Sequence, residues 1–207
     1  MPLPMVHLST AIKVCEKLKI NPSPQLLLGS IAPDAIHMRK NSGREDKRVT
    51  HLTDKPEFDH YKRVKSMYEL YENNSDSDLF KGYCIHLLTD YYWSDLVKVG
   101  YKNNLPENLP QEIRSSLYYL ETDQIDFNLY RNMDWRPEVW KVLREVDTTD
   151  ISSLLTAEEI SLWRDRVVDW FDMIKEEPYI TPKYITDTKV DAFIEKASTM
   201  ILEYLFQ

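Results

Sequence analysis

Two residues near the middle of the chain have types and a spacing that suit metal binding. His86 and Asp90 are four positions apart in the run from Gly82 to Asp95, which is rich in apolar and aromatic residues. If this run is helical, both side chains leave the same face one turn apart. An imidazole and a carboxylate in that arrangement can bind one divalent cation. The alternative is a core helix that contains a hydrogen-bonded His–Asp pair.

Two more residues of the same chemistry lie at the ends of predicted apolar helices. His7 stands at the start of an amphipathic helix that the spacing predicts over residues 6–19. A second, nearly all-apolar helix from Gln25 to about Ala32 is predicted to end at Pro33 and to be followed by Asp34. A carboxylate at the end of a buried helix is costly without a partner, so Asp34 is a candidate for the same site.

A fifth candidate, His51, lies between these helices and the central one. Residues 38–56 are polar and lack helical periodicity, so we interpret them as a loop that carries His51. The helix with His86 is predicted to begin at Ser75 or Asp76 and to end near residue 99. The sequence would then bring imidazoles and carboxylates from several elements together. Two neutral imidazoles and two carboxylates suit zinc, iron, nickel or manganese.

The remainder of the chain is also predicted to be helical. Residues 111–132 have a long helical pattern with apolar side chains from Ile113 to Leu129 on one side, and Thr156 opens a capping-box sequence. Only 4 glycines occur in 207 residues, which disfavours many short strands with tight turns. We expect an all-α, single-domain bundle over residues 1–207, with further helices at about 57–73, 137–146, 156–175 and 187–206.

Composition excludes some classes of function. The net charge of −8 disfavours a general nucleic-acid-binding surface. No uncharged apolar run approaches the length of a membrane span, and no signal peptide is evident, so we expect a cytoplasmic protein. The 2 cysteines match neither a disulfide framework nor a zinc ribbon.

Four short segments, taken in order, resemble the bacterial zinc-dependent phospholipase C family. That family is all-helical and shares its fold with fungal single-strand nucleases. The resemblance covers about the first hundred residues and implies that Asp34, His51, His86 and Asp90 hold one metal ion. It implies that His7 helps to hold a second ion, with Asp90 as the bridge. The segments are His7-Leu-Ser-Thr-Ala, Gly29-Ser-Ile-Ala-Pro-Asp34, Thr50-His51 and Gly82-Tyr-Cys-Ile-His86-Leu-Leu-Thr-Asp90.

The chain departs from the family pattern after Asp90. The family has a histidine about ten residues beyond the one matched by His86 and a His/Glu pair further on, whereas no histidine follows His86 here. Four carboxylates lie near these positions and are either oxygen substitutes or surface residues; we therefore expect one or two ions. They are Asp95, Glu121, Asp123 and Asp126. Gly29 and Gly82 stand where helices would approach each other closely around the site.

The polar loop carries a local excess of positive charge in an acidic protein. Arg39, Lys47 and Arg48 lie between two predicted ligands and could bind the negative charge of a phosphate; the alternative is a solvated flexible loop. His37, one turn beyond Asp34, is either a proton donor to a leaving group or an exposed bystander. His60 is interpreted as a solvated surface residue.

These residues predict a metal-dependent hydrolase that acts on a phosphoester through a metal-activated water. Asp34, Asp90 and His37 are the candidate catalytic residues, and the substrate is a phospholipid head group or another small phosphoester. The alternative is a non-catalytic helical protein that binds a metal for structure or sensing. A His-Asp phosphohydrolase is disfavoured because the chain has no His followed directly by Asp.

Overall fold

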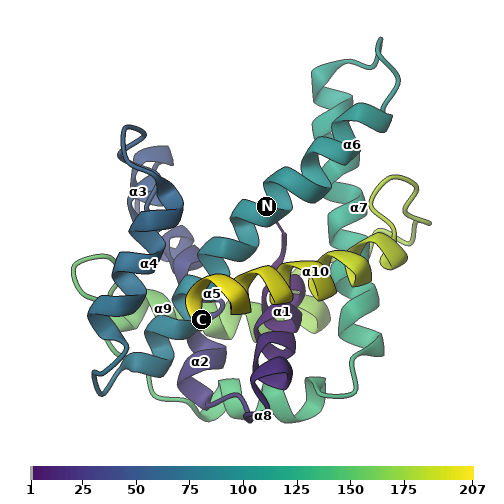
Figure 1. The fold of residues 1–207 in the computed structure, drawn as a ribbon. Coiled ribbons are helices and arrows are strands. Elements are labelled where there is room, and N and C mark those ends of the chain that lie inside the picture. Colours follow the sequence, from purple (N-terminus) through teal and green to yellow (C-terminus); the bar gives the residue numbers. More distant parts are fainter. Residues whose placement is uncertain (1) are drawn as a thin grey trace.

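The computed structural model describes residues 2–207 as a set of α-helices joined by short turns and loops (Figure 1). This part of the chain contains no β-strand, only an isolated bridge between Ile151 and Leu155, so the predicted all-α fold is confirmed. The α-helices are α1 (Pro4–Leu18), α2 (Pro24–Gly29), α3 (Arg44–Thr50), α4 (His60–Tyr71), α5 (Ser77–Trp93), α6 (Val99–Asn104), α7 (Gln111–Asn132), α8 (Arg136–Glu145), α9 (Ala157–Asp169) and α10 (Asp187–Leu205).

The central helix is α5, against which α1, α2, α4 and α10 all pack (Figure 1). Most of its side chains are buried, including polar ones, so it is enclosed nearly all round rather than amphipathic. Its neighbour α1 is buried along its first three turns and lies against α10 and α5. The core is therefore built around the helix that carries His86 and Asp90.

Two glycines allow α2 to lie directly against α5. A Cβ atom on Gly29 would overlap the backbone carbonyl of Leu79, and one on Gly82 would overlap the backbone carbonyl of Leu26. Backbone atoms cannot move aside as a flexible side chain can, so only glycine fits at either position. This confirms the close approach expected at these two residues.

The second helix ends earlier than predicted. α2 ends at Gly29, and a 3₁₀-helix, η1 (Ala32–Met38), begins three residues later. Pro33 lies in the first turn of η1, where its missing N–H has no partner to lose, so the proline helps to start this element rather than to stop α2. Asp34 is consequently held inside a buried turn of helix.

The interpretation of residues 38–56 as a loop is wrong for its middle part, which forms α3. This helix is short and charged, and Thr50 is its only buried residue. The side chain of Asp46 accepts a hydrogen bond from the backbone N–H of Gly43 at 2.8 Å and so helps to fix the start of the helix. Because only one of its side chains is buried, α3 has no apolar periodicity, and the sequence pattern therefore does not predict this helix.

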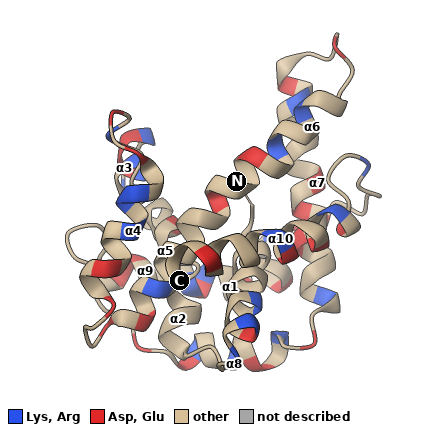
Figure 2. Ribbon diagram, viewed as in Figure 1, with Lys and Arg blue, Asp and Glu red and all other residues tan. Residues whose placement is uncertain are grey.

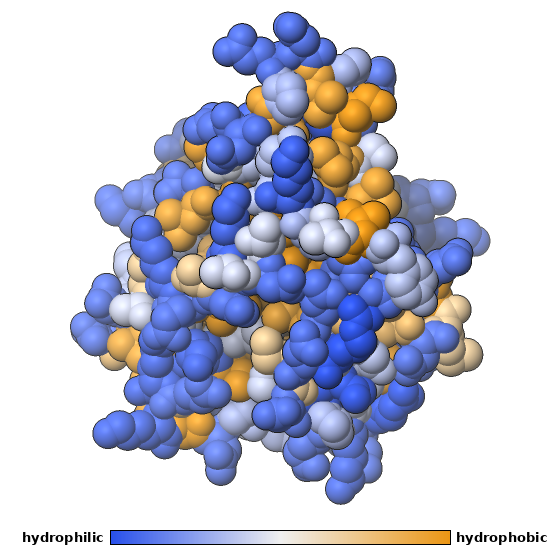
Figure 3. Space-filling model, turned by 90° about the vertical axis from the view of Figure 1, so that its right-hand side faces the viewer, coloured by the Kyte–Doolittle hydropathy of each residue, from blue (hydrophilic) through white to orange (hydrophobic). Residues whose placement is uncertain are grey.

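The central helix does not end near residue 99 but runs on through a π-helical turn, η2 (Ser94–Lys98), into α6. Figure 1 shows α6 and the start of α7 projecting from the body as a helical hairpin. The apolar side of α7 is therefore only partly buried: Ile125 and Leu129 lie in the core, whereas Ile113 and Leu120 are exposed. Figure 3, which faces this side of the molecule, shows apolar side chains gathered on its upper part.

The later elements follow the predicted pattern. Thr156 caps α9 with the expected capping box, in which Glu159 reaches back to the N–H of Thr156. After α9 a π-helical turn, η3 (Trp170–Ile174), leads to an extended linker, and α10 completes the chain. Within residues 2–207, no helix is both long enough and apolar enough to cross a lipid bilayer.

Candidate metal centre

The five predicted ligands come from four separate elements and lie together. His7 is contributed by α1, Asp34 by η1, His51 by the end of α3, and both His86 and Asp90 by α5. The Nε2 atom of His51 lies 3.4 Å from Asp34 Oδ1 and 3.5 Å from Asp90 Oδ2. The Nε2 atom of His86 lies 3.9 Å from Asp34 Oδ2, and that of His7 lies 3.6 Å from Asp90 Oδ1.

The cluster is buried, and several of its polar atoms have no hydrogen-bond partner. His7 and His86 are each 1% exposed, and their rings stack with centroids 3.7 Å apart. Among residues 2–207 no partner is found for either nitrogen of His7, for Nε2 of His51 and His86, or for Oδ1 of Asp90. Buried polar atoms are nearly always paired, so this concentration of unpaired donors and acceptors is suited to binding a ligand.

Hydrogen bonds from the opposite ring nitrogens turn two of the imidazoles toward the cluster. His86 Nδ1 lies 2.9 Å from the backbone oxygen of Ser30, and His51 Nδ1 lies 3.0 Å from that of Lys47. A carbonyl oxygen only accepts, so Nδ1 carries the proton in both rings and the Nε2 lone pair faces the cluster. Metal-binding histidines are commonly oriented in this way.

Burial keeps two of the imidazoles neutral, which is the form that binds metals. Desolvation lowers the pKa of His86 to about 3, although the nearby Asp34 carboxylate opposes the shift. Desolvation, followed by repulsion from His86, also lowers the pKa of His7 well below its usual value. Both rings therefore offer lone pairs at neutral pH without having to lose a proton first.

The two carboxylates are in different electrostatic states. Burial raises the pKa of Asp90 to about 6, although His51 opposes the shift. Burial acts on Asp34 in the same direction, but the neighbouring rings of His51 and His86 and the ammonium of Lys47 outweigh it and hold the pKa well below the usual range. Asp34 is therefore the permanent negative charge of the cluster, whereas the charge of Asp90 depends on what it binds.

The donor set fits a divalent metal ion. Two overlapping groups have ligand atoms that all lie within 4.8 Å of one another: His7, Asp34 and His86 form one, and His51, His86 and Asp90 form the other. Imidazole nitrogens and carboxylate oxygens are the ligands of first-row transition metals. The groups share His86, whose one free lone pair on Nε2 can bind a single ion, so both groups cannot use this residue at the same time.

The chain is strained directly after His51. Leu52 has a φ of 55°, a left-handed conformation that a branched side chain rarely adopts. Helix α4 holds this turn in place: Arg63 donates to the backbone oxygen of Leu52 and pairs with Asp54 at 2.8 Å, and Nε2 of His60 lies 3.0 Å from the backbone oxygen of His51. His60 is thus not a solvated surface residue but positions a candidate ligand, a role that sequence spacing does not reveal.

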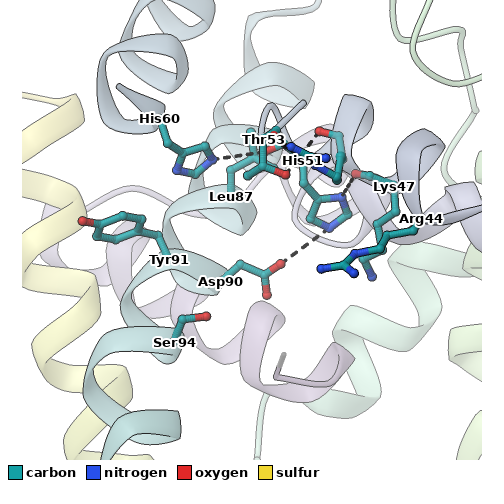
Figure 4. Close-up of a pocket in the computed structure, with 10 residues that line it drawn as sticks. Arg44, Lys47, His51, Thr53, His60, Leu87, Asp90, Tyr91 and Ser94 are labelled. Atoms are coloured by element: carbon teal, nitrogen blue, oxygen red, sulfur yellow. Dashed lines mark hydrogen bonds and ion pairs between the residues drawn. The ribbon is translucent and has the colours of Figure 1, made fainter. Parts of the chain in front are cut away.

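A cavity of about 480 Å³ opens beside the cluster (Figure 4). His51 and Asp90 form its inner end, and three cations of α3 line one side: Arg44, Lys47 and Arg48. Figure 2 shows their blue segments on the ribbon of α3. The opposite side is formed by Leu87, Tyr91 and His60, the last two with rings stacked at 5.8 Å. The cavity thus joins the candidate metal ligands to a charged wall and an apolar one.

Of the predicted phosphate-binding residues, Lys47 and Arg48 line this cavity and Arg39 does not. The guanidinium of Arg39 pairs with the Glu159 carboxylate through two contacts of 2.6 and 3.0 Å and also donates to the backbone oxygen of Leu154. It therefore ties η1 to α9. Arg44 takes its place on the cavity wall; it lies in the same basic segment, so only the fold distinguishes the two arginines.

His37 lies at the edge of the cluster and outside the cavity lining. Its Nε2 atom is 3.0 Å from Lys47 Nζ and 3.7 Å from Asp34 Oδ1. Because the lysine ammonium can only donate, this nitrogen carries no proton in the observed arrangement and cannot act as the predicted proton donor. Burial, together with the charge of Lys47, lowers the pKa of His37, which also favours the neutral ring.

Two of the four additional carboxylates hold the backbone together. Glu121 is 1% exposed and accepts hydrogen bonds from the consecutive backbone N–H groups of residues 183–185. Asp126 accepts from the N–H of Met5 at 3.1 Å and so satisfies a free donor at the start of α1. Both carboxylates have structural partners and neither belongs to the metal-ligand groups.

The other two also lie outside the cluster. Asp123 pairs with Lys175 at 2.7 Å. Asp95 is exposed on η2 and belongs to neither ligand group. The centre therefore consists of the five residues described above, without oxygen substitutes for the later histidines of the phospholipase C pattern.

Comparison with known proteins does not place the chain in a family. No protein-family model, no curated protein and no solved structure matches it. The resemblance of its short segments to zinc-dependent phospholipase C remains a prediction, and the case for the centre rests on its own geometry.

Proposed function

We propose that this protein is a metal-dependent hydrolase of phosphoesters, with zinc as the first candidate ion. The observation that carries the proposal is the group of buried, unpartnered donor atoms at the inner end of a cavity with a cationic wall. Iron, nickel or manganese would suit the same ligands. The ordered resemblance to the zinc-dependent phospholipase C family supports the same activity and ion.

A bound divalent cation would act as a Lewis acid, which lowers the pKa of a bound water and polarises a phosphoryl oxygen. Lys47 and Arg44 would bind the equatorial oxygens of the phosphoryl group and stabilise the charge that develops on them. The water oxygen forms the new bond to phosphorus as the ester P–O bond breaks. One proton of the water passes through a carboxylate to the leaving alcohol. The products are the alcohol and a phosphate with one ester group fewer than the substrate.

Asp90 is better placed than Asp34 to handle that proton. Asp34 Oδ1 already accepts a hydrogen bond from Lys47 at 2.7 Å, and its pKa is held low. Asp90 lines the cavity, and its Oδ1 atom has no hydrogen-bond partner among residues 2–207. We therefore assign Asp90 the role of orienting the water, whereas Asp34 acts as a ligand and anchors Lys47.

Metal content tests the first half of the proposal. Purified full-length protein, prepared without chelator, should contain at least one equivalent of a transition metal by elemental analysis. The variants His86→Ala and Asp90→Asn should lose most of it. Asp95→Asn is the matched control, since it removes one carboxylate five residues further along the same continuous helix but outside the cluster. Absence of stoichiometric metal from the wild-type protein would overturn the proposal.

Turnover tests the second half. A panel of phosphomonoesters and phosphodiesters should reveal hydrolysis in the presence of zinc, manganese, iron or nickel. Replacing His51 by alanine should reduce this activity by at least about 100-fold, because it removes a ligand that also lines the cavity. Activity that survives this substitution would belong to a contaminant or to another site.

The burial of the centre favours a second candidate, a metal site for structure or sensing. All five side chains are at most 14% exposed, and a structural metal site is one whose coordination sphere is filled by protein donors. Cobalt-substituted protein distinguishes the two. Its visible absorption spectrum should change when inorganic phosphate is added if a coordination position is open, and should not change if the sphere is closed.

A further inference from the structure

We propose that the cavity selects doubly charged phosphomonoesters over singly charged phosphodiesters, and that Arg44 is the residue that makes this selection. The inference rests on the hydrolase function proposed above and specifies its substrate class. It comes from the charges on the cavity wall and from the chemical character of the two opposite walls.

Arg44 has no partner in the described part of the chain. It lies on the same side of α3 as Lys47 and Arg48, which follow it by three and four residues, and all three line the cavity. Within residues 2–207 no hydrogen bond or ion pair involves Arg44. Figure 4 shows its side chain reaching from α3 toward the side on which Asp90 lies. Its fork of N–H donors is thus available to a ligand.

The other two cations of this wall are already engaged. Arg48 pairs with Glu45 at 2.9 Å and also donates to the backbone oxygen of Thr53. Lys47 donates to Asp34 at 2.7 Å and lies 3.0 Å from His37. Their charges help to form the wall, but Arg44 is the cation of this wall that has no hydrogen bond or ion pair within residues 2–207.

The charges of the site are balanced when the ligand carries two negative charges. One divalent ion is neutralised by the carboxylates of Asp34 and Asp90, and Arg48 is neutralised by Glu45. The charges of Lys47 and Arg44 remain. A phosphomonoester is a dianion above pH of about 6, whereas a diester carries one negative charge at any such pH. A diester would leave one of these cations without a counter-charge.

The size and lining of the cavity also favour phosphomonoesters as the substrate class. Its volume of about 480 Å³ is in the range of small-molecule sites rather than of polymer-binding grooves. Leu87 and Tyr91 offer an apolar surface for one organic group, on the side opposite the cations. A second ester group would have to lie against Arg44 and Lys47, where it would exclude water from the cations without offering them an acceptor.

Binding without turnover provides the first test. Methyl phosphate and dimethyl phosphate differ by one methyl group and one charge. Titrated calorimetrically into the metal-loaded, full-length protein at mildly alkaline pH, methyl phosphate should bind at least about 10-fold more tightly. Arg44→Gln should remove most of this difference, and Arg44→Lys should keep part of it. Lys40→Gln is the matched control, because it removes one exposed charge from the same segment but not from the cavity lining.

Turnover provides the second test. With 4-nitrophenyl phosphate, Arg44→Gln should lower kcat/KM by about 10- to 100-fold, the loss expected for one charge-assisted hydrogen bond. With bis(4-nitrophenyl) phosphate the change should be less than about threefold. The loss on the monoester should shrink at high salt, since Arg44 is exposed to solvent.

The outcomes separate this inference from the hydrolase proposal. Equal binding of the two methyl esters, or an equal effect of Arg44→Gln on both, overturns the selection of dianions even if the protein is a hydrolase. Tight, Arg44-dependent binding of methyl phosphate without turnover of any ester overturns the hydrolase function and leaves a site that binds phosphate dianions.

Discussion

At the scale of single residues, the centre is an arrangement of side chains that are costly to bury alone. Three imidazoles and two carboxylates, all shielded from solvent, leave five ring or carboxylate atoms without partners. Each such atom costs about 1–3 kcal/mol when it is left unpaired. A bound cation would satisfy all of them together, and the proposed metal site would account for these residue types in the interior of a helical protein.

The metal-free protein should lose stability in mild acid. The folded-state pKa values of His7 and His86 lie below those of the unfolded chain, so the unfolded state binds more protons below pH of about 6.5. Each of these rings then lowers the free energy of unfolding by about 1.4 kcal/mol for every pH unit of acidification. Asp90 has a raised pKa of about 6 and therefore adds a similar amount to the free energy of unfolding as the pH falls below that value. The lowered pKa values of His37 and His60 add to this loss and the raised pKa of Asp126 offsets part of it, so the free energy of unfolding is expected to fall between about pH 6 and pH 4.

Chemical denaturation of chelator-treated protein at several pH values measures this slope. The variant His86→Asn should flatten it, because an amide does not titrate in this range. His37→Asn serves as the comparison and should flatten the slope less, since His37 is half exposed and lies at the edge of the cluster. An unchanged slope in His86→Asn would show that another group governs the acid sensitivity.

At the scale of elements, the centre depends on how closely α2 lies against α5. His86 is one turn beyond Gly82, and Asp34 follows α2 by five residues. The distance between these two ligands is therefore set by the glycine contact between the helices. The ion pair between Arg39 and Glu159 adds a second restraint by tying the end of η1 to α9.

Replacing Gly82 by alanine should damage both the fold and the centre. The added methyl group would overlap backbone atoms of α2, and the helices would have to separate at a cost of about 3 kcal/mol. Gly100→Ala is the matched control, because a Cβ atom there meets nothing within 4 Å. The control should stabilise the protein by about 0.5–1 kcal/mol through improved helix propensity.

Thermal melting and metal content, measured on both variants, test this prediction. Gly82→Ala should show a lower Tm and a weaker affinity for metal, whereas Gly100→Ala should keep the affinity of the wild-type protein. A Gly82→Ala variant with wild-type stability would mean that α2 and α5 can pack further apart without harm.

At the scale of the whole molecule, the centre joins segments that are far apart in the chain. Its ligands span residues 7–90 and come from α1, η1, α3 and α5, whereas α10, the last helix, closes the core over α1. An unfolded chain cannot hold these ligands together, so metal binding and folding should be coupled.

Removing the metal should therefore lower the stability of the entire protein. Free metal at about 1,000 times its dissociation constant adds about 4 kcal/mol to the free energy of unfolding. Chelation should lower the Tm accordingly, and added zinc should restore it. Asp90→Asn should melt at the same temperature with and without chelator. A wild-type Tm that does not respond to chelation would argue against a bound metal.

The sequence by itself determined the class of the fold and the candidate ligands. Periodicity, capping residues and the scarcity of glycine were sufficient to predict an all-α chain, because these are local properties of the polypeptide. The i, i+4 spacing of His86 and Asp90 placed both on one face of a helix. His7 and Asp34 are distinguished by residue type and by their position at the ends of apolar segments, where a polar side chain is costly, and His51 by its residue type within a polar segment.

Only the tertiary structure decided which charged residues face the site. Arg39 and Arg44 are indistinguishable in sequence, yet one pairs with Glu159 on α9 and the other lines the cavity. Likewise, Glu121 and Asp126 satisfy backbone N–H groups from distant segments rather than binding metal. Contacts of this kind join residues up to 121 positions apart, and local propensity carries no information about them. The chemistry of the ligands is therefore readable from the sequence, whereas the shape and charge of the cavity beside them are not.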